Sequence, residues 1–224
     1  MNLVKSQDYF NPIDVRLRCH IIGCGSVGST IAELLARLGV TKISLYDFDT
    51  VSAHNLANQM FNNFDIGRPK VDAVKDLICN INPDASNDIE IHSEGYTDAT
   101  RLSGYVFLCV DNIDLRREIA TKNRPNQSIK AMFDFRTRLE DAQHYAAIWN
   151  DNAMVQNFIN SMDFSHEEAH AATPVTACNV EMGVAPTVRI ICSFGVSNFM
   201  NYIRKKDVKK MILIDAFSME VDAY

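Results

Sequence analysis

The chain has 224 residues, 47% of them apolar and 22% charged, an ordinary composition for a globular domain that folds without disulfide or metal support. Its 22 lysine and arginine residues against 28 aspartate and glutamate residues give a formal net charge of -6, which excludes a protein that binds nucleic acid through general positive charge. No run approaches the roughly 20 consecutive apolar residues of a membrane span, and the start, MNLVKSQDYFNP, lacks the apolar core of a secretory signal. We therefore expect no nucleic-acid partner and no membrane partner.

Cysteine usage indicates a cytoplasmic location. None of the six cysteines forms a C-x-x-C pair, and four of them lie inside apolar segments. Scattered buried thiols are typical of a reducing compartment. The same spacing argues against a structural zinc site made by four cysteines.

The first half of the chain alternates short β-rich runs with helical periodicity, which predicts βαβ units around a parallel sheet. In chain order, we expect a strand at 19–22, a helix at 27–38, a strand at 42–46, a helix at 71–81, strands at 89–92 and 105–110, a helix at 113–122 and a strand at 129–133.

The second half differs in character. In chain order, we expect a strand at 144–149, a helix at 152–162, a polar loop at 163–176 without a clear period, a long apolar helix at 183–202 and a strand at 211–214. The prediction is one α/β domain with a mostly parallel sheet, helices on both faces, and a C-terminal elaboration of strand and helix.

A G-x-G-x-x-G motif, GCGSVG at residues 23–28, lies directly after a predicted strand and directly before a predicted helix. In this context the first glycine permits a tight turn, the second lets a phosphate approach the backbone, and the third lets helix and strand pack closely. The helix N-terminus presents free N–H groups and partial positive charge to an anion. The motif therefore predicts a Rossmann-like nucleotide site that includes Gly23, Gly25, Ser26 and Gly28.

An acidic residue at the end of the second strand of such a site holds the ribose hydroxyls. Asp47 stands at this position, in the segment YDFD at residues 46–49. The glycine motif and Asp47 fit an NAD-dependent dehydrogenase and an ATP-using enzyme equally well.

The residues that follow favour ATP. From Tyr46 the chain reads YDFDTVSAHNLANQMFNNFDIGRPKVDAV, which adds a second aspartate, several amides and a lysine. Hydride transfer does not need these groups, whereas attack on the α-phosphate of ATP needs fixed cations and amides to meet the developing charge. Lys70 opens a predicted helix, where its charge opposes the helix dipole, so a phosphate-binding role is favoured over a solvated lysine.

Together these motifs resemble the ThiF/MoeB-type family of adenylyltransferases, whose fold is shared with ubiquitin-activating enzymes. The matching segments are the glycine motif at 23–28, D-x-D at 47–49, N-L-x-x-Q at 55–59, D-I-G-x-P-K at 65–70 and an aspartate after an apolar strand at 109–112. The resemblance implies one adenylation domain over residues 1–224, with a nucleotide-binding half at about 1–135 and an acceptor and dimer half at about 136–224.

The resemblance also implies a role for each matching residue. The nucleotide-binding residues would be Gly23, Gly25, Ser26, Gly28, Asp47, Asp49, Gln59 and Lys70. Asn55 and Lys70 would meet the phosphates, and Asp111 would bind Mg²⁺ through its carboxylate. The competing interpretation of Asp111-Asn112 is a helix cap, which is compatible with metal binding.

The reaction that the resemblance implies uses ATP and Mg²⁺. It joins a carboxylate, typically the C-terminal glycine of a ubiquitin-like or sulfur-carrier protein, to AMP and releases pyrophosphate. The acyl-adenylate is then open to attack by sulfur or another nucleophile. The resemblance further implies a homodimer.

The chain departs from the family pattern at Asn58, where N-L-x-R-Q would place an arginine. Because asparagine cannot supply a full charge, either another cation substitutes or the activity is weakened or lost. The candidate substitutes are Arg16, Arg18, Arg68 and Arg136. Arg136 follows a predicted strand, as an arginine does in the short bacterial and phage ThiF-like proteins that the chain resembles, so we assign it a catalytic role against the alternative of a surface salt bridge.

Two further segments carry reactive side chains. Cys178 lies where many family members have a cysteine before the last long helix, and a helix N-terminus would lower the pKa of its thiol; the alternative is a buried small hydrophobe. The segment HEEAH at 166–170 matches the letters of an H-E-x-x-H zinc motif. Since zinc proteases place that motif on a core helix of a different fold, we interpret it as coincidence or as part of a lid.

The leading hypothesis is therefore an adenylyltransferase that acts on a protein or peptide C-terminus. Three alternatives stay open. One is adenylylation of a small-molecule carboxylate at the same nucleotide site. Another is a non-catalytic ThiF-like nucleotide-binding scaffold, which Asn58 suggests. The last is an NAD-dependent oxidoreductase, which rests only on the glycine motif and Asp47.

Overall fold

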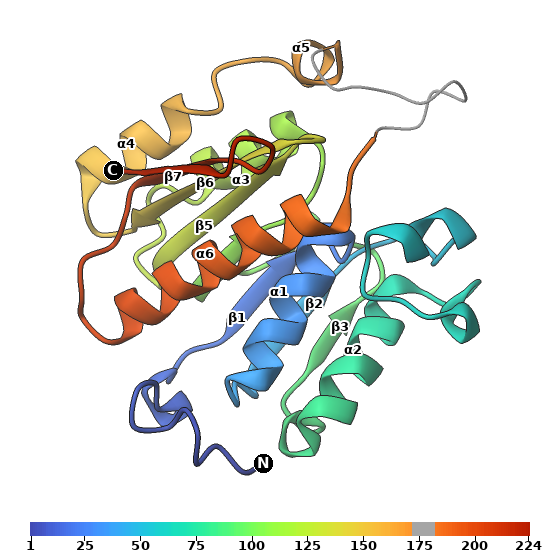
Figure 1. The fold of residues 1–224 in the computed structure, drawn as a ribbon. Helices are drawn as coiled ribbons and strands as arrows, with labels where there is room; N and C mark the ends of the chain where they lie inside the picture. The colour runs from blue at the N-terminus through green and yellow to red at the C-terminus, as the bar shows by residue number, and fades with distance from the viewer. Residues whose placement is uncertain (172–181) are drawn as a thin grey trace.

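In the computed structural model, which describes residues 1–171 and 182–224, the chain builds an eight-stranded sheet with the order β3-β2-β1-β4-β5-β6-β7-β8 (Figure 1). The parallel strands are β1 (Cys19–Ile22), β2 (Ile43–Tyr46), β3 (Glu90–His92), β4 (Gly104–Leu108) and β5 (Ile129–Thr137). Three antiparallel strands follow: β6 (Asp141–Ile148), β7 (Met211–Asp215) and β8 (Glu220–Ala223). The predicted α/β fold with a mostly parallel sheet is confirmed.

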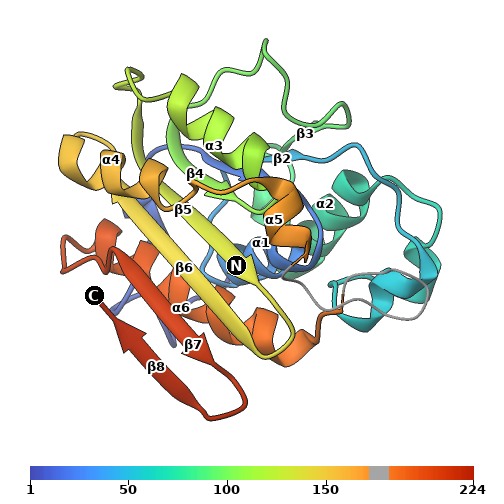
Figure 2. The ribbon, with the colours of Figure 1, turned by 90° about the horizontal axis from the view of Figure 1, so that it is seen from above.

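Helices cover both faces of the sheet (Figure 2). One face carries α1 (Ser26–Arg37), α2 (Lys70–Ile81) and α6 (Ala185–Ile203), and the other carries α3 (Ile113–Lys122) and α4 (Asn152–Asn160). A short helix, α5 (His166–Ala171), contacts α3. The connections include the 3-10 helices η1 (Pro12–Asp14), η2 (Ala53–Ala57), η3 (Asn63–Asp65) and η4 (Pro83–Ala85).

Each face of the sheet has its own apolar core, because side chains alternate along a strand. In β4, Tyr105 and Phe107 belong to the core beneath α1, α2 and α6, whereas Val106 and Leu108 belong to the core beneath α3 and α4. The central strands β1, β2 and β4 are buried at every residue, as expected of parallel strands covered on both faces.

The hairpin of β5 and β6 differs from the prediction. The sequence predicted strands that end at residue 133 and begin at residue 144, but β5 continues to Thr137 and β6 begins at Asp141. The added length carries Asp134 and Arg136 into the sheet. Charged residues mark the end of a strand in an apolar pattern, but here these two pair with each other.

The sequence does not predict β8 or α5, and the reason is the same for both, because neither element has a buried side. All four residues of β8 are exposed, and β8 pairs only with β7 at the edge of the sheet. No residue of α5 is buried, although this helix lies in the segment predicted to be an irregular loop. Since prediction from sequence depends on an apolar period, such elements leave no signal.

The strand order defines where a ligand can bind. β1 pairs with β2 on one side and with β4 on the other, so the chain leaves the two neighbouring strands β1 and β4 in opposite directions. Open α/β sheets bind ligands at this point, outside the carboxyl ends of the strands. The fold therefore brings the turns after β1, β2 and β4 to one edge, which we call the carboxyl edge.

Candidate functional site

The glycine motif forms a tight turn between β1 and α1. Gly23 has a φ of 95°, and a Cβ atom there would lie 2.8 Å from the backbone of Cys109 and Val110. A Cβ atom on Gly28 would lie 1.8 Å from the carbonyl oxygen of Gly23, so only glycine lets α1 pack on the turn. By contrast, a Cβ atom on Gly25 would meet no atom of the described part of the chain within 4 Å. The backbone at Gly25 therefore faces open space that a phosphate can enter.

The first turn of α1 offers its N–H groups to the same space. α1 begins at Ser26 with Gly25 as its N-cap residue, and no side chain of residues 1–171 or 182–224 caps it. The N–H groups of a first helical turn have no acceptor within the helix, and the helix dipole adds partial positive charge. This arrangement fits an anion such as a phosphate group.

Asp47, at the end of β2, holds the glycine turn in place. Its Oδ2 atom accepts a hydrogen bond from the N–H of Cys24 at 2.6 Å, and its Oδ1 atom accepts one from the N–H of Asp49 at 2.8 Å. Burial raises the pKa of the Asp47 carboxyl, and the two backbone donors oppose that shift. The predicted ribose-binding residue thus lies beside the glycine motif, and each oxygen keeps a second lone pair for a ligand hydroxyl.

Lys70 lies at the start of α2 and is held by Asp49. The Lys70 Nζ lies 2.9 Å from Oδ2 of Asp49, and the Lys70 N–H donates to the Asp49 carbonyl at 2.9 Å. Lys70 is 8% exposed, so its ammonium is directed by this pair rather than free in water. The second aspartate of D-x-D therefore positions the cation that the sequence predicts at the phosphates.

The N-L-x-x-Q segment brings two amides to the same region. The Oδ1 atom of Asn55 accepts the N–H of Ser52 at 2.9 Å, which leaves the amide NH₂ of Asn55 to donate elsewhere. The Oε1 atom of Gln59 is buried and has no hydrogen-bond partner within the described residues, an uncommon state in a folded protein. The N–H of Met60 donates to Oγ of Ser29 in α1 at 3.1 Å. The amides are thereby tied to the first turns of α1.

Asp111 follows β4 at the carboxyl edge. Its side chain is exposed and has no ion-pair or hydrogen-bond partner in the described part of the chain. The helix cap belongs to Asn112, whose Oδ1 accepts the N–H of Leu115 at 3.0 Å. Of the two interpretations weighed for Asp111-Asn112, capping therefore falls to the second residue, and the carboxylate of Asp111 is free to bind a cation.

This set of groups fits a nucleotide with a divalent cation. The open backbone at Gly25 and the uncapped α1 suit phosphate oxygens, Lys70 supplies a fixed cation, and Asp111 supplies the hard oxygen ligand that Mg²⁺ prefers. The cluster formed by residues 23–28, 47–49, 55–59, 70 and 111 is called the nucleotide edge below.

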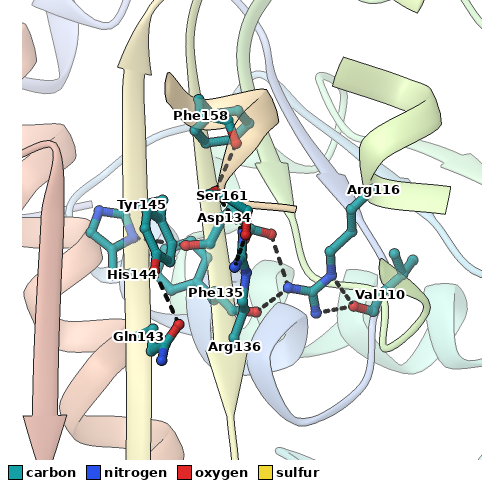
Figure 3. A network of polar contacts seen from close by, with 10 residues as sticks. All are labelled: Val110, Arg116, Asp134, Phe135, Arg136, Gln143, His144, Tyr145, Phe158 and Ser161. Atoms are coloured by element: carbon teal, nitrogen blue, oxygen red, sulfur yellow. Dashed lines mark hydrogen bonds and ion pairs between the residues drawn. The ribbon is translucent and has the colours of Figure 1, made fainter. Parts of the chain in front are cut away.

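A second polar cluster surrounds Asp134 in β5 (Figure 3). Asp134 is fully buried, with Oδ1 2.8 Å from Nη1 of Arg116 and Oδ2 2.7 Å from Nε of Arg136. Burial disfavours the carboxylate, but the two guanidinium groups outweigh it and hold the pKa of Asp134 below its ordinary value. We call Arg116, Asp134 and Arg136 the arginine cluster.

The guanidinium group of Arg136 has several hydrogen-bond and ring partners in addition to Asp134. Its Nη1 donates to the Ser161 carbonyl at 2.7 Å, its Nη2 contacts Oγ of Ser161 at 2.8 Å, and its guanidinium lies 4.3 Å from the ring centroid of Tyr145. Arg136 lies within β5 rather than after a strand, and its salt bridge is buried rather than at the surface. These contacts fasten the end of α4 to the sheet. The catalytic role of Arg136 stays a prediction.

Sequence reasoning missed Arg116. Its Nε donates to the Val110 carbonyl at 2.6 Å, and its Nη1 donates to the Phe135 carbonyl at 2.5 Å, so it joins the turn before Asp111 to β5. The available signal was its spacing, because Arg116 lies three residues from Ile113 and from Ile119 on the buried face of α3. A charged residue on that face needs a buried partner.

The other candidate cations lie elsewhere or are paired. Arg16 and Arg18 precede β1, at the opposite edge of the sheet, and Arg18 binds the carbonyls of Ile43 and Asp88 and the carboxylate of Glu90. Arg68 forms ion pairs with two carboxylates, Asp65 at 2.9 Å and Asp76 at 2.5 Å.

The remaining expected features give no second site. Among the residues described, no group of three or more histidine, cysteine, aspartate or glutamate side chains is placed to hold a metal ion, so the HEEAH segment lacks the third ligand. His166 starts α5, where its N–H donates to Oδ2 of Asp114 at 3.2 Å. Cys178 lies outside the described residues. None of the described helices is long and apolar enough to cross a membrane.

Comparison with protein families gives one match that covers nearly the whole chain. The model of the ThiF family matches residues 15–223. A ubiquitin-like modifier-activating enzyme 5 of Caenorhabditis briggsae is 27% identical over an alignment of 209 residues, and the match covers 81% of this chain and 48% of that protein. A molybdopterin-synthase adenylyltransferase of Salmonella typhimurium is 30% identical over an alignment of 106 residues, and the match covers 46% of this chain and 43% of that protein. The chain thus spans less than half the length of these relatives.

Solved structures share the fold at low sequence identity. A crystal structure of E. coli MccB with ATP has a TM-score of 0.74 and 15% identity, and the match covers 96% of this chain and 66% of that one. A crystal structure of PaaA has a TM-score of 0.70 and 17% identity, covering 97% of this chain and 68% of that one. At this identity the likeness concerns the fold alone.

Proposed function

The chain belongs to the ThiF family, and from this premise we propose that it is an ATP-dependent adenylyltransferase that activates a carboxylate as an acyl-adenylate. One observation carries the proposal, namely the gathering of unsatisfied groups at the nucleotide edge. The open backbone of Gly25 and the uncapped start of α1 lie on the same edge as the Lys70–Asp49 pair and Asp111, whose carboxylate has no partner among the described residues.

The nucleotide lies over the glycine turn in this proposal. The backbone N–H groups of Gly25, Ser26 and the next residues of α1 bind phosphate oxygens. Asp47 accepts hydrogen bonds from the ribose hydroxyls with the lone pairs that Cys24 and Asp49 do not use. The close contacts of Gly23 and Gly28 keep this turn rigid, so the donors are fixed before the reaction begins.

Lys70 and the neighbouring amides meet the charge of the reacting phosphate. Asp49 holds the Lys70 ammonium in one direction, the amide NH₂ of Asn55 supplies a hydrogen-bond donor to the phosphate oxygens, and the amide of Gln59 lies in the same segment. Asp111 would hold Mg²⁺, which when bound neutralises charge on the phosphate oxygens. Asp111 is suited to this because no other described group occupies its carboxylate.

The chemical step is a nucleotidyl transfer. A carboxylate oxygen of the acceptor attacks the α-phosphorus of ATP and forms an acyl–phosphate bond. The bond between the α-phosphorus and the oxygen that bridges to the β-phosphate breaks, and pyrophosphate leaves with the electron pair. Because the acceptor enters as a carboxylate, no proton transfer is needed. Lys70 stabilises the negative charge on the α-phosphate oxygens as the leaving group departs.

The acceptor in this proposal is the C-terminus of a ubiquitin-like or sulfur-carrier protein. Support comes from the relatives, since one is a ubiquitin-like modifier-activating enzyme and another a molybdopterin-synthase adenylyltransferase. A small-molecule carboxylate would use the same nucleotide edge with a different acceptor surface.

A cytoplasmic homodimer completes the proposal. The five cysteines described are all free, which supports a reducing compartment. The apolar side of α6 is packed in the core through Ile191, Val196 and Phe199 and therefore gives no support for a dimer surface. Support for the dimer therefore comes from family membership, and light scattering after gel filtration tests it: a mass of twice 25.2 kDa is expected.

ATP–pyrophosphate exchange with candidate acceptors tests the enzyme assignment. We expect exchange with an acceptor that ends in a free carboxylate, and its loss in Asp111→Asn without a change in melting temperature. Asp222→Asn, which changes an exposed aspartate on the distant edge strand β8, is the matched control and keeps exchange.

Other outcomes assign the chain to the alternatives. ATP binding without exchange for any protein, peptide or small carboxylate would make it a nucleotide-binding scaffold. Exchange with small carboxylates alone would move the acceptor to that class. Binding of NADH that ATP does not compete with would overturn the ATP assignment.

A further inference from the structure

Arg189, in the first turns of α6, is an exposed cation near the nucleotide edge. Its side chain has no carboxylate partner within residues 1–171 and 182–224, whereas Arg68 and Arg136 are both ion-paired. α1 and α6 both begin at the carboxyl edge and lie side by side (Figure 1). The position of Arg189 on α6 decides whether its charge can reach the glycine turn.

The packing of α6 shows which way Arg189 projects. Three residues later, the Cys192 thiol lies 3.8 Å from the carbonyl oxygen of Val27 in the first turn of α1. Residues three apart share a helix face, so Arg189 projects on the α1 side. On the other side of α6, Thr187 donates to the Leu139 carbonyl at 2.9 Å, next to β5 and β6.

Arg189 also lies nearer the carboxyl edge than Val27 does. It is about one helical turn closer to the start of α6 than Cys192, and helical side chains lean toward the helix N-terminus. Its charge acts on the same neighbourhood, since burial raises the pKa of the Cys192 thiol and Arg189 opposes that shift. The guanidinium therefore lies on the side of α6 that faces the start of α1.

The chain leading into α6 touches the segment that lacks a charge. A Cβ atom on Gly183 would lie 3.3 Å from Nδ2 of Asn58, so the chain two residues before α6 lies beside the N-L-x-x-Q segment. Asn58 supplies no charge there, and Lys70 is shared with Asp49. A triphosphate carries several negative charges, which a single paired lysine does not balance.

We propose that Arg189 is the second cation of the nucleotide site and binds the phosphate chain of ATP together with Lys70. The proposal rests on the proposed function, because it assigns a further residue to the same site. Arg189 has the fixed helical backbone and the direction that this task needs, and its guanidinium has no carboxylate partner among the described residues. An arginine suits it because its planar donors match phosphate oxygens in pairs.

Calorimetric binding of ATP, AMP and adenosine to the full chain tests the assignment. Arg189→Gln is expected to weaken ATP binding roughly tenfold to a hundredfold, the range for losing a charge-assisted contact, and to leave adenosine binding unchanged. Arg189→Lys keeps part of the ATP affinity. Arg124→Gln, which removes an exposed arginine between α3 and β5 at the opposite edge, is the matched control and binds ATP as the wild type does.

A compensating change makes the test sharper. If Arg189 supplies the charge missing at Asn58, then Asn58→Arg in the Arg189→Gln background restores most of the ATP affinity. Unchanged melting temperatures in the absence of nucleotide exclude a folding defect as the cause of the loss.

Failure of this inference is distinct from failure of the proposed function. Wild-type affinity for ATP in Arg189→Gln, with weakened binding in Lys70→Gln, overturns the role of Arg189 and leaves the enzyme assignment intact. Equal weakening for adenosine and ATP also overturns it, as does a defect confined to the acceptor in exchange assays. A wild-type chain that binds no ATP overturns both.

Discussion

The nucleotide edge and the arginine cluster are both rich in charged residues, but they differ in whether those residues have partners. In the arginine cluster, Asp134 pairs with two guanidinium groups, which also bind backbone carbonyls. At the nucleotide edge, by contrast, Asp111 and the Oε1 atom of Gln59 have no partner among the described residues, and no side chain caps α1. Charge alone therefore does not identify a site; at the nucleotide edge, groups without partners among the described residues gather beside an uncapped helix start, a combination that the arginine cluster lacks.

The difference in partners also indicates different roles for the two clusters, structural support for the arginine cluster and ligand binding for the nucleotide edge. Arg116 joins the turn that precedes Asp111 to β5, and Arg136 joins the end of α4 to the same strand. The arginine cluster thus stabilises the backbone that supports the nucleotide edge. Changes in the cluster should lower stability, whereas changes at the nucleotide edge should lower binding and leave stability nearly unchanged.

The largest effect is expected for Asp134→Asn. It leaves Arg116 and Arg136 without their buried counter-charge, a change that typically destabilises by about 3–5 kcal/mol. Asp141→Asn is the control, because it removes an exposed ion pair with Arg138, worth at most about 1 kcal/mol. Urea unfolding measures both. Equal losses in the two variants would contradict the contrast between a buried cluster and a surface pair.

The next effect concerns two glycines of one motif. Gly28→Ala would place a Cβ atom 1.8 Å from the Gly23 carbonyl oxygen, so we expect a loss of about 3 kcal/mol or more in the free energy of unfolding. Gly25→Ala meets nothing within 4 Å and should keep stability within about 0.5 kcal/mol of the wild type. ATP titration of the second variant should show weakened binding, since the methyl group enters the proposed phosphate space. ATP binding by Gly25→Ala as tight as that of the wild type would contradict the placement of a phosphate group at Gly25.

A smaller effect depends on pH and on His144, a buried residue of β6 that contacts Asn198 of α6. Its Nδ1–H donates to the Asp134 carbonyl at 3.1 Å, and its Nε2 accepts from Asn198 at 3.1 Å, so the neutral ring fits its site. Burial lowers the pKa of His144 from 6.5 to about 4. The unfolded chain therefore binds more protons between these pH values, and stability falls as pH falls through that window.

For His144 alone, this loss is roughly 2 kcal/mol between pH 7 and pH 5. Unfolding of His144→Gln and wild type across this range measures it as a shallower pH slope in the variant. His54→Gln, at an exposed position in η2, is the matched control and keeps the wild-type slope. Identical slopes in all three proteins would show that His144 is protonated as easily in the folded state as in the unfolded one.

The smallest effect on stability is expected for Asp111→Asn. Because this side chain has no partner among the residues described, its free energy of unfolding should change by no more than about 0.5 kcal/mol. Calorimetry should nevertheless show that Mg²⁺ no longer strengthens ATP binding. A large loss in the free energy of unfolding of this variant would show that Asp111 stabilises the fold and would contradict its place at the nucleotide edge.

The parts of the molecule that the sequence predicted well are those fixed by neighbours along the chain. The glycine turn needs only a strand before it and a helix after it, and Lys70 is notable because it opens a helix against the dipole. Asp47 follows from its place at the end of a buried strand. In each case the local backbone is enough to give the side chain its position.

The parts that were missed depend on partners far away in the chain. Asp49 acts through Lys70, and the salt bridge between Arg116 and Asp134 joins a helix to a strand on a different segment. The sequence predicts an end of β5 at residue 133 because Asp134 and Arg136 are charged, whereas in the structure their charges are paired inside the sheet. The hydrophobic period and the secondary-structure propensity of one segment cannot specify contacts with a distant segment.

The strand order has a consequence for how the chain assembles in time. Thr137 pairs with Ala142 across a short turn, whereas Cys19 pairs with Tyr105, which is synthesised much later. Pairings between distant residues carry a larger entropy of loop closure and form more slowly. The β5–β6 hairpin can thus form before β1, which leads into the glycine turn, has paired with β4. Pulse-labelled hydrogen exchange during refolding should find the amides of β5 and β6 protected earlier than those of β1.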